Sequence, residues 1–247
     1  MAFTVVIPAR YGSSRFPGKP LADINGKPMI QHVVEQCRMA KSLQDVVVAT
    51  DDPRIEDAVR AFCSVERTAS DHLSGTDRVA EVAGRMQVDG IINIQGDEPM
   101  IDPEVIDQVA GALEDGEMST AAVRISDEED YKNPNAVKVV IDHRDRALYF
   151  SRSTVPFYRD GVELEITDQL KEYPFLKHLG IYGYRRDVLL NLVKLPVSGL
   201  ERMERLEQLR ALENGVSIQV VTVDYESISV DVPADLVRVE KILRNKI

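Results

Sequence analysis

The sequence predicts an α/β fold with a mainly parallel central sheet and helices on both of its faces. Short β-branched runs alternate with segments of helical periodicity in the first half of the chain, which is the pattern of βαβ units. Residues 46–49 and 91–94 are apolar almost throughout, as is typical of parallel strands buried on both faces. Ligands of such sheets bind beyond the carboxyl ends of the strands, so the loops there are the first places to look for function.

Six strands are expected, and the first three are separated by helices. The strands cover residues 4–7, 46–49, 91–94, 137–141, 179–184 and 218–223. Apolar residues spaced three and four apart predict four helices, with stripes within residues 29–37, 55–62, 79–86 and 105–113. Pro53 and Pro103 each open a helix directly after an Asp, where the missing N–H of proline costs least. Two further helices are expected at 201–213 and 234–244.

This regularity breaks between about residues 116 and 177. We expect an inserted dimerisation or flap region here, with an antiparallel excursion of the sheet and a polar, helix-free stretch at 159–172. No Gly/Ser-rich linker or charge block separates the region from the rest. The sequence therefore predicts a single domain over residues 1–247.

Composition excludes several classes of function. Of 247 residues, 41 are acidic and 30 basic, and the net charge of −11 disfavours a nucleic-acid partner. No apolar run approaches the roughly 18 residues of a membrane helix, and the N-terminus has the pattern of a strand, not of a signal peptide. Two cysteines, Cys37 and Cys63, exclude a disulfide framework. A cytoplasmic enzyme or binding protein without a membrane partner is expected.

The loop after the first strand carries the first chemical signal. It reads PARYGSSRFPGKP over residues 8–20 and contains the cations Arg10, Arg15 and Lys19. It lacks the glycine spacing of a dinucleotide fingerprint, and Pro20 stands where a Walker loop needs Ser or Thr. Three cations on a loop at this position suit a polyphosphate, since guanidinium and ammonium groups can bind different oxygens. The alternative is a solvated basic turn.

Two further carboxylates come after apolar or β-branched runs. Asp97 comes directly after the apolar run 91–94, and Asp231 follows residues 228–230. Mg²⁺ takes one or two carboxylates beside a phosphate, so this pair would suffice to hold it. The alternative for each is an ordinary Asp before a helix. No zinc-ligand cluster or serine-hydrolase motif supports hydrolytic chemistry.

Several motifs together carry a family resemblance. They are the first loop, VATDD at 48–52, SGTDR at 74–78, QGDEP at 95–99, NPNAVKV at 133–139, ALYFSR at 147–152, KHLGIY at 177–182 and LEQLRAL at 206–212. The combination resembles the cytidylyltransferases that activate acidic sugars, and among these the members acting on 3-deoxy-manno-octulosonate (KDO). The resemblance implies a Rossmann-like nucleotidyltransferase fold, a homodimer and transfer of CMP from CTP to KDO with Mg²⁺, for lipopolysaccharide biosynthesis.

The resemblance also implies roles for particular residues. Those assigned to the nucleotide are Ala9, Arg10, Ser14, Arg15, Lys19, Ser74, Gly75 and Arg78. Those assigned to the sugar acid are Gln95, Arg152, His178, Tyr182 and Glu207. Lys19, Asp97 and Asp231 would be catalytic, and the two aspartates would bind the metal. From the residues alone, a lone histidine such as His178 is more often structural than catalytic.

The chain departs from the family pattern before its last helix. Val232 and Ala234 replace a capping hydroxyl and a first-turn acid, which makes the orientation of that helix less secure. Phe16 stands where Leu is usual, and no change of chemistry is expected from it. Two alternatives stay open: a cytidylyltransferase for the 8-amino analogue of KDO or for a sialic acid, and a protein that binds CTP without turnover.

Overall fold

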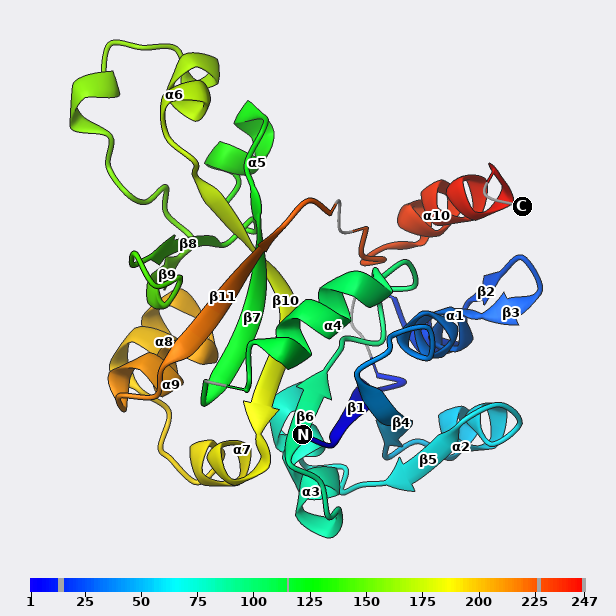
Figure 1. Cartoon of the computed structure of the whole chain (residues 1–247). Helices are drawn as coiled ribbons and strands as arrows, with labels where there is room; N and C mark the ends of the chain where they lie inside the picture. Colours follow the sequence, from blue (N-terminus) through cyan, green and yellow to red (C-terminus); the bar gives the residue numbers. More distant parts are fainter. Residues whose placement is uncertain (13–15, 115, 226–227, 246–247) are drawn as a thin grey trace.

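The computed structural model describes residues 1–12, 16–114, 116–225 and 228–245 (Figure 1). Its main sheet has nine strands, with the order β11-β7-β10-β6-β1-β4-β5 and the pair β8 and β9 attached to β10. The strands are β1 (Phe3–Ala9), β4 (Leu43–Thr50), β5 (Ser64–Arg67), β6 (Gly90–Asn93), β7 (Met118–Arg124), β8 (Lys138–Ile141), β9 (Ala147–Ser151), β10 (Leu176–Arg185) and β11 (Ile218–Val223). A small separate hairpin is formed by β2 (Asp23–Ile24) and β3 (Lys27–Pro28).

The sheet consists of two parallel parts joined by one antiparallel strand. Strands β5, β4, β1 and β6 are parallel neighbours, and β7 is parallel to β11. Strand β10 lies between β6 and β7 and is antiparallel to both. The join between β6 and β10 therefore separates the strands of residues 3–93 from those of residues 118–223.

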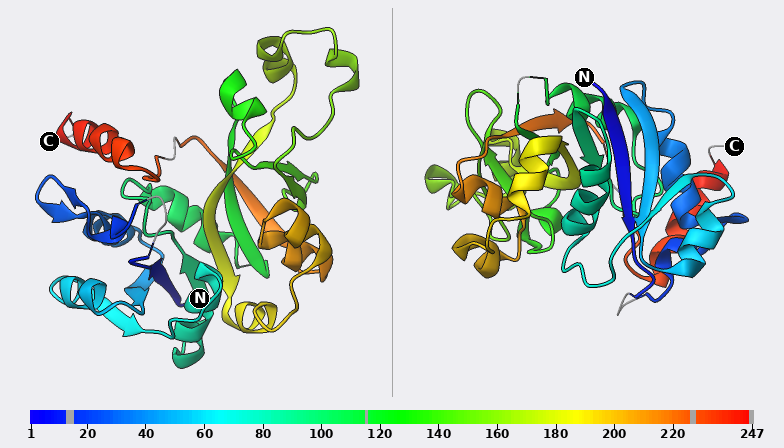
Figure 2. Two further views of the ribbon diagram at one scale, coloured as in Figure 1. Left: turned by 180° about the vertical axis from the view of Figure 1, so that it is seen from behind. Right: turned by 90° about the horizontal axis from the view of Figure 1, so that it is seen from below.

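Helices cover both faces, as expected. On one face α1 (Met29–Cys37), α2 (Pro53–Val59) and α4 (Pro103–Gly111) pack on residues such as Val5 and Ile7. On the other face α3 (Gly75–Arg85), α7 (Arg186–Leu192) and α9 (Gln208–Glu213) pack with Val6, because side chains alternate along β1. The two further views in Figure 2 show this arrangement from behind and from below. The predicted α/β class with a mainly parallel sheet is confirmed.

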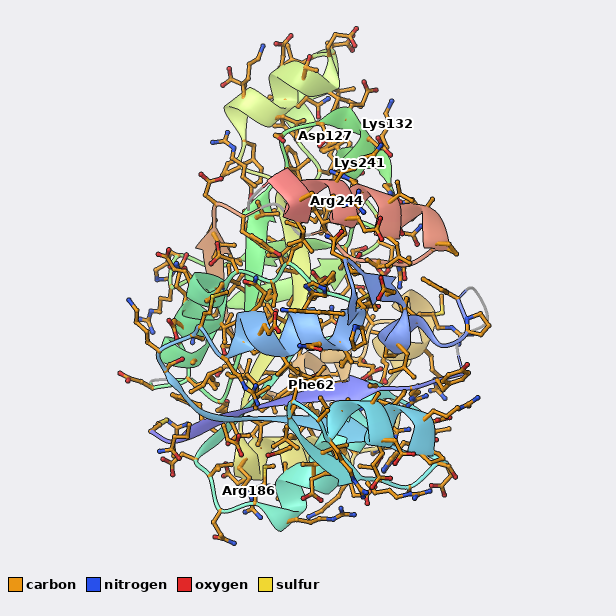
Figure 3. The ribbon with its side chains drawn as sticks, turned by 90° about the vertical axis from the view of Figure 1, so that its right-hand side faces the viewer. Phe62, Asp127, Lys132, Arg186, Lys241 and Arg244 are labelled. Carbon is orange, nitrogen blue, oxygen red and sulfur yellow. The ribbon has the colours of Figure 1, made fainter. Side chains whose placement is uncertain are left out.

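Two smaller clusters extend the main body. Helix α10 (Pro233–Asn245) lies outside α1 and the β2–β3 hairpin, with Val239 against Ile24 and Met29; Figure 3 shows Lys241 and Arg244 on this helix. At the other end, α5 (Glu128–Lys132) and α6 (Ile166–Glu172) form a tip beyond the ends of β7 and β10 (Figure 1). Within the described residues, no helix is both long and apolar enough to span a bilayer.

Two predicted elements differ from the structure. The helix expected at 201–213 is two helices, α8 (Gly199–Glu204) and α9, separated at Arg205, whose φ of 56° is left-handed. The carbonyl of Glu204 accepts a hydrogen bond from Nε of Arg152 at 2.7 Å, and this side chain takes the place of the next helical turn. The stretch 159–172 is not helix-free, since it holds the 3₁₀ turn η2 (Arg159–Gly161) and α6, which docks through Leu170.

Candidate active site

The three residues assigned to catalysis lie together, although they are far apart in sequence. Nζ of Lys19 is 2.6 Å from Oδ2 of Asp97 and 3.5 Å from Oδ1 of Asp231. The backbone N–H of Val230 donates to the carbonyl of Asp97 at 2.9 Å, which ties the two acidic loops together. One ammonium group therefore faces two carboxylates at the carboxyl end of the first parallel strands.

A tight loop places Lys19. Gly18 has a φ of 72°, and its N–H donates to the carbonyl of Tyr11 at 2.9 Å. The positive φ favours glycine here, and a Cβ would lie 3.1 Å from the Tyr11 ring, which would have to shift slightly to admit it. Lys19 then opens the 3₁₀ turn η1 (Lys19–Leu21), with Pro20 in its first turn.

Asp97 and Asp231 are the residues here that could hold a divalent cation. Their carboxylates converge on one cationic point, and hard oxygen donors are what Mg²⁺ prefers. Among the described residues there is no cluster of three or more His, Cys, Asp or Glu side chains placed to bind a metal. A site of two carboxylates suits an ion that completes its shell with water and phosphate oxygens.

Asp235 caps the segment that carries Asp231. Its Oδ2 accepts hydrogen bonds from the backbone N–H groups of Asp231 at 2.8 Å and Val232 at 2.9 Å. Asp235 is the third residue of α10, and its bond to the N–H of Val232 is one half of a capping box; Val232 offers no hydroxyl for the other half. This contact orients the start of α10 despite the two departures from the family pattern.

The N-terminus of α3 approaches the ends of β1 and β6. Ser74 caps the helix in a reciprocal capping box with Asp77. A Cβ at Gly75 would lie 3.4 Å from Pro8 and 3.8 Å from Oε1 of Gln95, so the helix start is packed closely against both neighbouring strands. Free N–H groups at such a helix start favour an anionic ligand.

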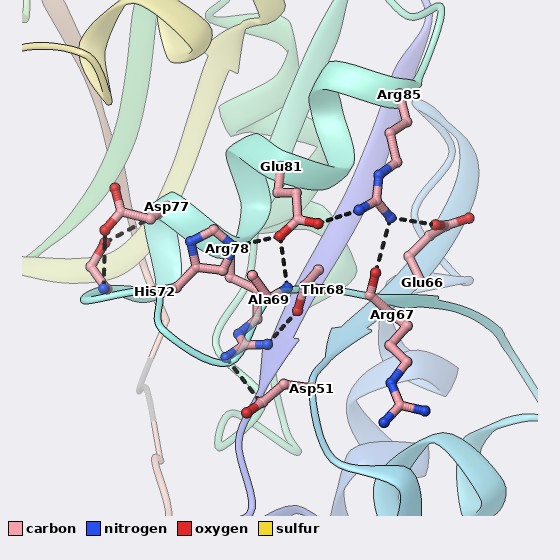
Figure 4. Close-up of polar contacts among 11 residues, drawn as sticks. Asp51, Glu66, Arg67, Thr68, Ala69, His72, Asp77, Arg78, Glu81 and Arg85 are labelled. Carbon is pink, nitrogen blue, oxygen red and sulfur yellow. Dashed lines mark hydrogen bonds and ion pairs between the residues drawn. The ribbon is translucent and has the colours of Figure 1, made fainter.

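Arg78 stabilises the region around the N-terminus of α3, and it is not among the residues that line the cavity described below. Its side chain is 1% exposed, and its guanidinium pairs with Asp51 at 2.9 Å and donates to the hydroxyl of Thr68 (Figure 4). Burial lowers the pKa of Arg78, and the nearby positive charge of Arg10 lowers it further. Nη2 of Arg10 is buried without a hydrogen-bond partner among the described residues, so it is a donor available for an anion.

The loop before α3 is held by Glu81. Its carboxylate accepts a hydrogen bond from the N–H of Ala69 at 2.9 Å and pairs with His72 and Arg85 (Figure 4). The same Arg85 donates to the carbonyl of Arg67 at 2.9 Å. These contacts fix both ends of the segment that leads to Ser74.

A cavity of about 340 Å³ opens beside these groups, between α3, β6, β10 and α9. Six of the residues predicted for the nucleotide and the sugar line it: Ser74, Gly75, Gln95, His178, Tyr182 and Glu207. Glu207 is oriented by Thr76, whose hydroxyl donates to its Oε2 at 2.7 Å. Burial lowers the pKa of His178 to about 3 and raises that of Tyr182, so both are neutral around pH 7.

Sequence reasoning missed other residues of this cavity. Gln208 lines it with a buried Nε2 that has no partner in the described structure. Thr76, Tyr184 and Arg210 line it as well. Gln208 and Arg210 lie within the motif 206–212, so the signal was present, but only Glu207 was assigned a role.

Arg152 lies outside the lining of the cavity. Besides the carbonyl of Glu204, its guanidinium binds that of Pro134 at 3.0 Å. Its own N–H donates to the carboxylate of Glu204 at 3.0 Å. In this structure Arg152 braces the joint between α8 and α9 at Arg205, two residues before Glu207.

Of the remaining residues predicted for the nucleotide, Ala9 ends β1. Ala9 is buried and lies opposite Thr50 of β4. Ser14 and Arg15 lie outside the described residues.

Comparison with known proteins gives one consistent result. A sequence model of the family described as Cytidylyltransferase matches residues 4–218. The chain is 50% identical to 3-deoxy-manno-octulosonate cytidylyltransferase of Geobacter sulfurreducens, over 98% of each chain. It is 49% identical to 8-amino-3,8-dideoxy-manno-octulosonate cytidylyltransferase of Shewanella pealeana, over 96% of each.

Solved structures agree with this result. The crystallised CMP:2-keto-3-deoxy-manno-octonic acid synthetase in complex with CTP superposes with a TM-score of 0.92, at 45% identity over 100% of both chains. The 4-diphosphocytidyl-2C-methyl-D-erythritol synthase of Anaerococcus prevotii shares the fold, with a TM-score of 0.63 at 11% identity over 98% of this chain and 96% of that one. The resemblance seen in the motifs is confirmed, and the chain belongs to the cytidylyltransferase family of nucleotidyltransferases.

Proposed function

We propose that the protein transfers CMP from CTP to the anomeric hydroxyl of KDO and releases pyrophosphate, giving CMP-KDO. The observation that carries this proposal is the meeting of Lys19, Asp97 and Asp231 next to the cavity lined by Gln95 and His178. It is supported by the full-length identity to a KDO cytidylyltransferase and by the match to a synthetase solved with CTP.

One group of residues would bind the triphosphate, and another would hold the metal that offsets its charge. Lys19, the unpartnered donor of Arg10 and the N-terminus of α3 would bind the triphosphate. Asp97 and Asp231 would hold Mg²⁺, which when bound offsets phosphate charge and makes a coordinated hydroxyl more acidic. Holding the sugar hydroxyl in line with the α-phosphorus is the remaining requirement, since phosphoryl-type transfer depends mainly on positioning.

The 8-amino analogue of KDO is a second candidate substrate. The relative from Shewanella pealeana that carries this activity in its name is 49% identical, which is close to the 50% of the KDO relative. Both reactions would use the same nucleotide residues, so they differ only in the group presented at one end of the sugar.

Pyrophosphate release in the presence of Mg²⁺ and CTP tests the proposal. KDO, its 8-amino analogue and a sialic acid are compared with the intact protein, Asp97→Ala and, as a control, Asp168→Ala, which removes an exposed carboxylate of α6. We expect release with KDO, retained in D168A and lost in D97A. Pyrophosphate release with one of the other acids and not with KDO would show that this acid is the substrate. CTP binding without release would indicate a nucleotide-binding protein.

We also propose that the enzyme works in the cytoplasm as a homodimer, with residues 116–177 at the dimer interface. Both cysteines are free and buried, which suits a reducing compartment. Sedimentation of the protein should give the mass of two chains, and substitution of the exposed Phe157 in this region should weaken that association. A monomer at all concentrations would contradict the homodimer.

A further inference from the structure

A bulge in β10 lies at the wall of the cavity. Leu179 is opposite Ala121 of β7, and Tyr182 is opposite Thr120, so Gly180 and Ile181 have no partner in that register. The hydroxyl of Thr120 lies inside this bulge, and its side chain is completely buried. Its oxygen is 2.7 Å from the carbonyl oxygen of Ile181 and 3.3 Å from that of Leu179.

The same oxygen is 3.0 Å from Nε2 of His178. A threonine hydroxyl has one proton to donate. Two oxygens 2.7 Å apart need that proton between them, so it is donated to the carbonyl of Ile181. The hydroxyl can then only accept from His178, and Nε2 must carry the ring proton.

The other ring nitrogen is thereby left as an acceptor. Nδ1 of His178 makes no hydrogen bond within the described part of the chain, and it is not among the buried polar atoms that lack a partner. His178 lines the cavity, so Nδ1 is open to it. The ring is held in place by Phe150, edge-on at 5.1 Å between centroids, and by Tyr182 at 5.2 Å.

We infer that Thr120 is a positioning residue that fixes His178 as the Nε2–H tautomer, so that Nδ1 accepts a hydrogen bond from a hydroxyl of the sugar acid. The identity of the ligand rests on the proposed function, whereas the tautomer does not. The arrangement favours a sugar that presents a hydrogen-bond donor to Nδ1 of His178, and it disfavours one that presents only a hydrogen-bond acceptor there. Because burial keeps His178 neutral, the ring serves as an acceptor and not as a cation for the sugar carboxylate.

The tautomer is measured directly by two-bond ¹H–¹⁵N correlation NMR of the intact protein. The four histidines are labelled, and His178→Gln identifies the signals of His178. We expect a pyrrole-type Nε2 and a pyridine-type Nδ1 in the unmodified protein and in Thr120→Ser. In Thr120→Val, which removes the acceptor, a mixture of tautomers is expected. A protonated Nδ1 in the unmodified protein would overturn the inference, even if T120V does not fold.

Kinetics test the consequence for the sugar. Thr120→Val should raise KM for KDO about ten-fold, the effect of losing one well-placed hydrogen bond, while KM for CTP stays within about two-fold. Thr120→Ser should restore KM. Ser119→Ala is the matched control, since its buried hydroxyl donates to the carbonyl of Val109 at 2.7 Å and does not contact His178.

The outcomes separate the inference from the proposed function. A rise of both KM values in T120V, equal to that in S119A, would show a merely structural role and overturn the inference. If no sugar is turned over at all, the proposed function fails, and the NMR experiment still decides whether Thr120 fixes the tautomer.

Discussion

Nζ of Lys19 lies 2.6 Å from Oδ2 of Asp97, and this pair joins the first loop of the chain to the loop after β6. The lysine side chain is 15% exposed and that of the aspartate 28%, so the pair is partly desolvated while still open to a ligand. A phosphate entering here would meet the ammonium group, and a cation would meet the carboxylates.

Replacing Lys19 by Met should reduce kcat/KM for CTP by about 10²–10³, which is typical for the loss of one group that stabilises developing charge. Folding should be little affected, because the carboxylates of Asp97 and Asp231 keep contact with solvent when the ammonium group is removed. Steady-state pyrophosphate release measures the change, and Lys171→Met, at an exposed lysine of α6, is the control. Activity within about three-fold of the unmodified protein would remove Lys19 from the site.

Asp235→Ala should raise the Mg²⁺ concentration needed for half-maximal rate by about ten-fold. The reason is that Asp235 holds the backbone of Asp231, and groups that orient a metal ligand are typically worth about 10–100-fold in metal affinity. A Mg²⁺ titration measures this, and Mn²⁺ binding followed by electron paramagnetic resonance gives a readout independent of turnover. Lys241→Ala, an exposed residue on the same helix, should change neither (Figure 3).

Asp51→Ala should lower the free energy of unfolding by about 2–3 kcal/mol. The substitution leaves the guanidinium of Arg78, which is 1% exposed, without its ionic partner, and an uncompensated buried charge is strongly destabilising. Urea unfolding measures the effect. The exposed ion pair of Asp168 and Lys171 on α6 provides the comparison. Asp168→Ala should lower the free energy of unfolding by less than about 0.5 kcal/mol.

Arg152→Lys tests whether Arg152 acts by bracing the α8–α9 joint or only by general packing. A lysine cannot reach the carbonyls of both Glu204 and Pro134, so we expect a loss of about 1–2 kcal/mol in stability and a higher KM for the sugar acid. Arg186→Lys is the matched control, because Arg186 also binds two carbonyls, those of Ala83 and Gly84, away from the cavity. Equal loss of stability with an unchanged KM in both variants would contradict the bracing role.

His178 should make the fold sensitive to acid. Burial lowers its pKa to about 3, from about 6.5 in the unfolded chain, so between these values the unfolded state binds the extra proton. The contribution of His178 to the free energy of unfolding is therefore fully present above pH 6.5. It is lost as the pH falls toward 3, at no more than ~1.4 kcal/mol per pH unit. Melting temperatures of the unmodified protein and His178→Gln should converge as the pH falls through this range. Parallel curves would show that His178 titrates normally.

The first half of the fold could be predicted because its signals are local. Helix α1 and strands β1 and β4 bury continuous or periodic apolar residues, which hydropathy alone reveals. Strand β7 was not predicted, although it lies inside the main sheet. It buries Ser119 and Thr120, whose hydroxyls bond to carbonyls of other elements, and no pattern of apolar residues marks such a strand.

The site divides in the same way. Lys19 and Asp97 follow β1 and β6 in recognisable motifs, so their convergence could be expected from the rule that parallel strands share one end. Residues 228–232 are not a strand, so the approach of Asp231 to Lys19 does not follow from that rule. The brace made by Arg152 depends on the left-handed turn at Arg205, and the proton position on His178 depends on the bulge at Gly180. Both arise from contacts between distant segments, which local sequence does not encode.

The antiparallel join between β6 and β10 has a consequence for how such an enzyme can diversify. Lys19 and Asp97 belong to the part of the sheet before this join, and His178, Tyr182 and Glu207 belong to the part after it. Substitutions between β7 and α9 can therefore alter which acceptor is admitted while Lys19, Asp97 and Asp231 stay in place. A chimaera exchanging residues 118–213 with a relative of different acceptor preference should inherit that preference together with an unaltered nucleotide requirement.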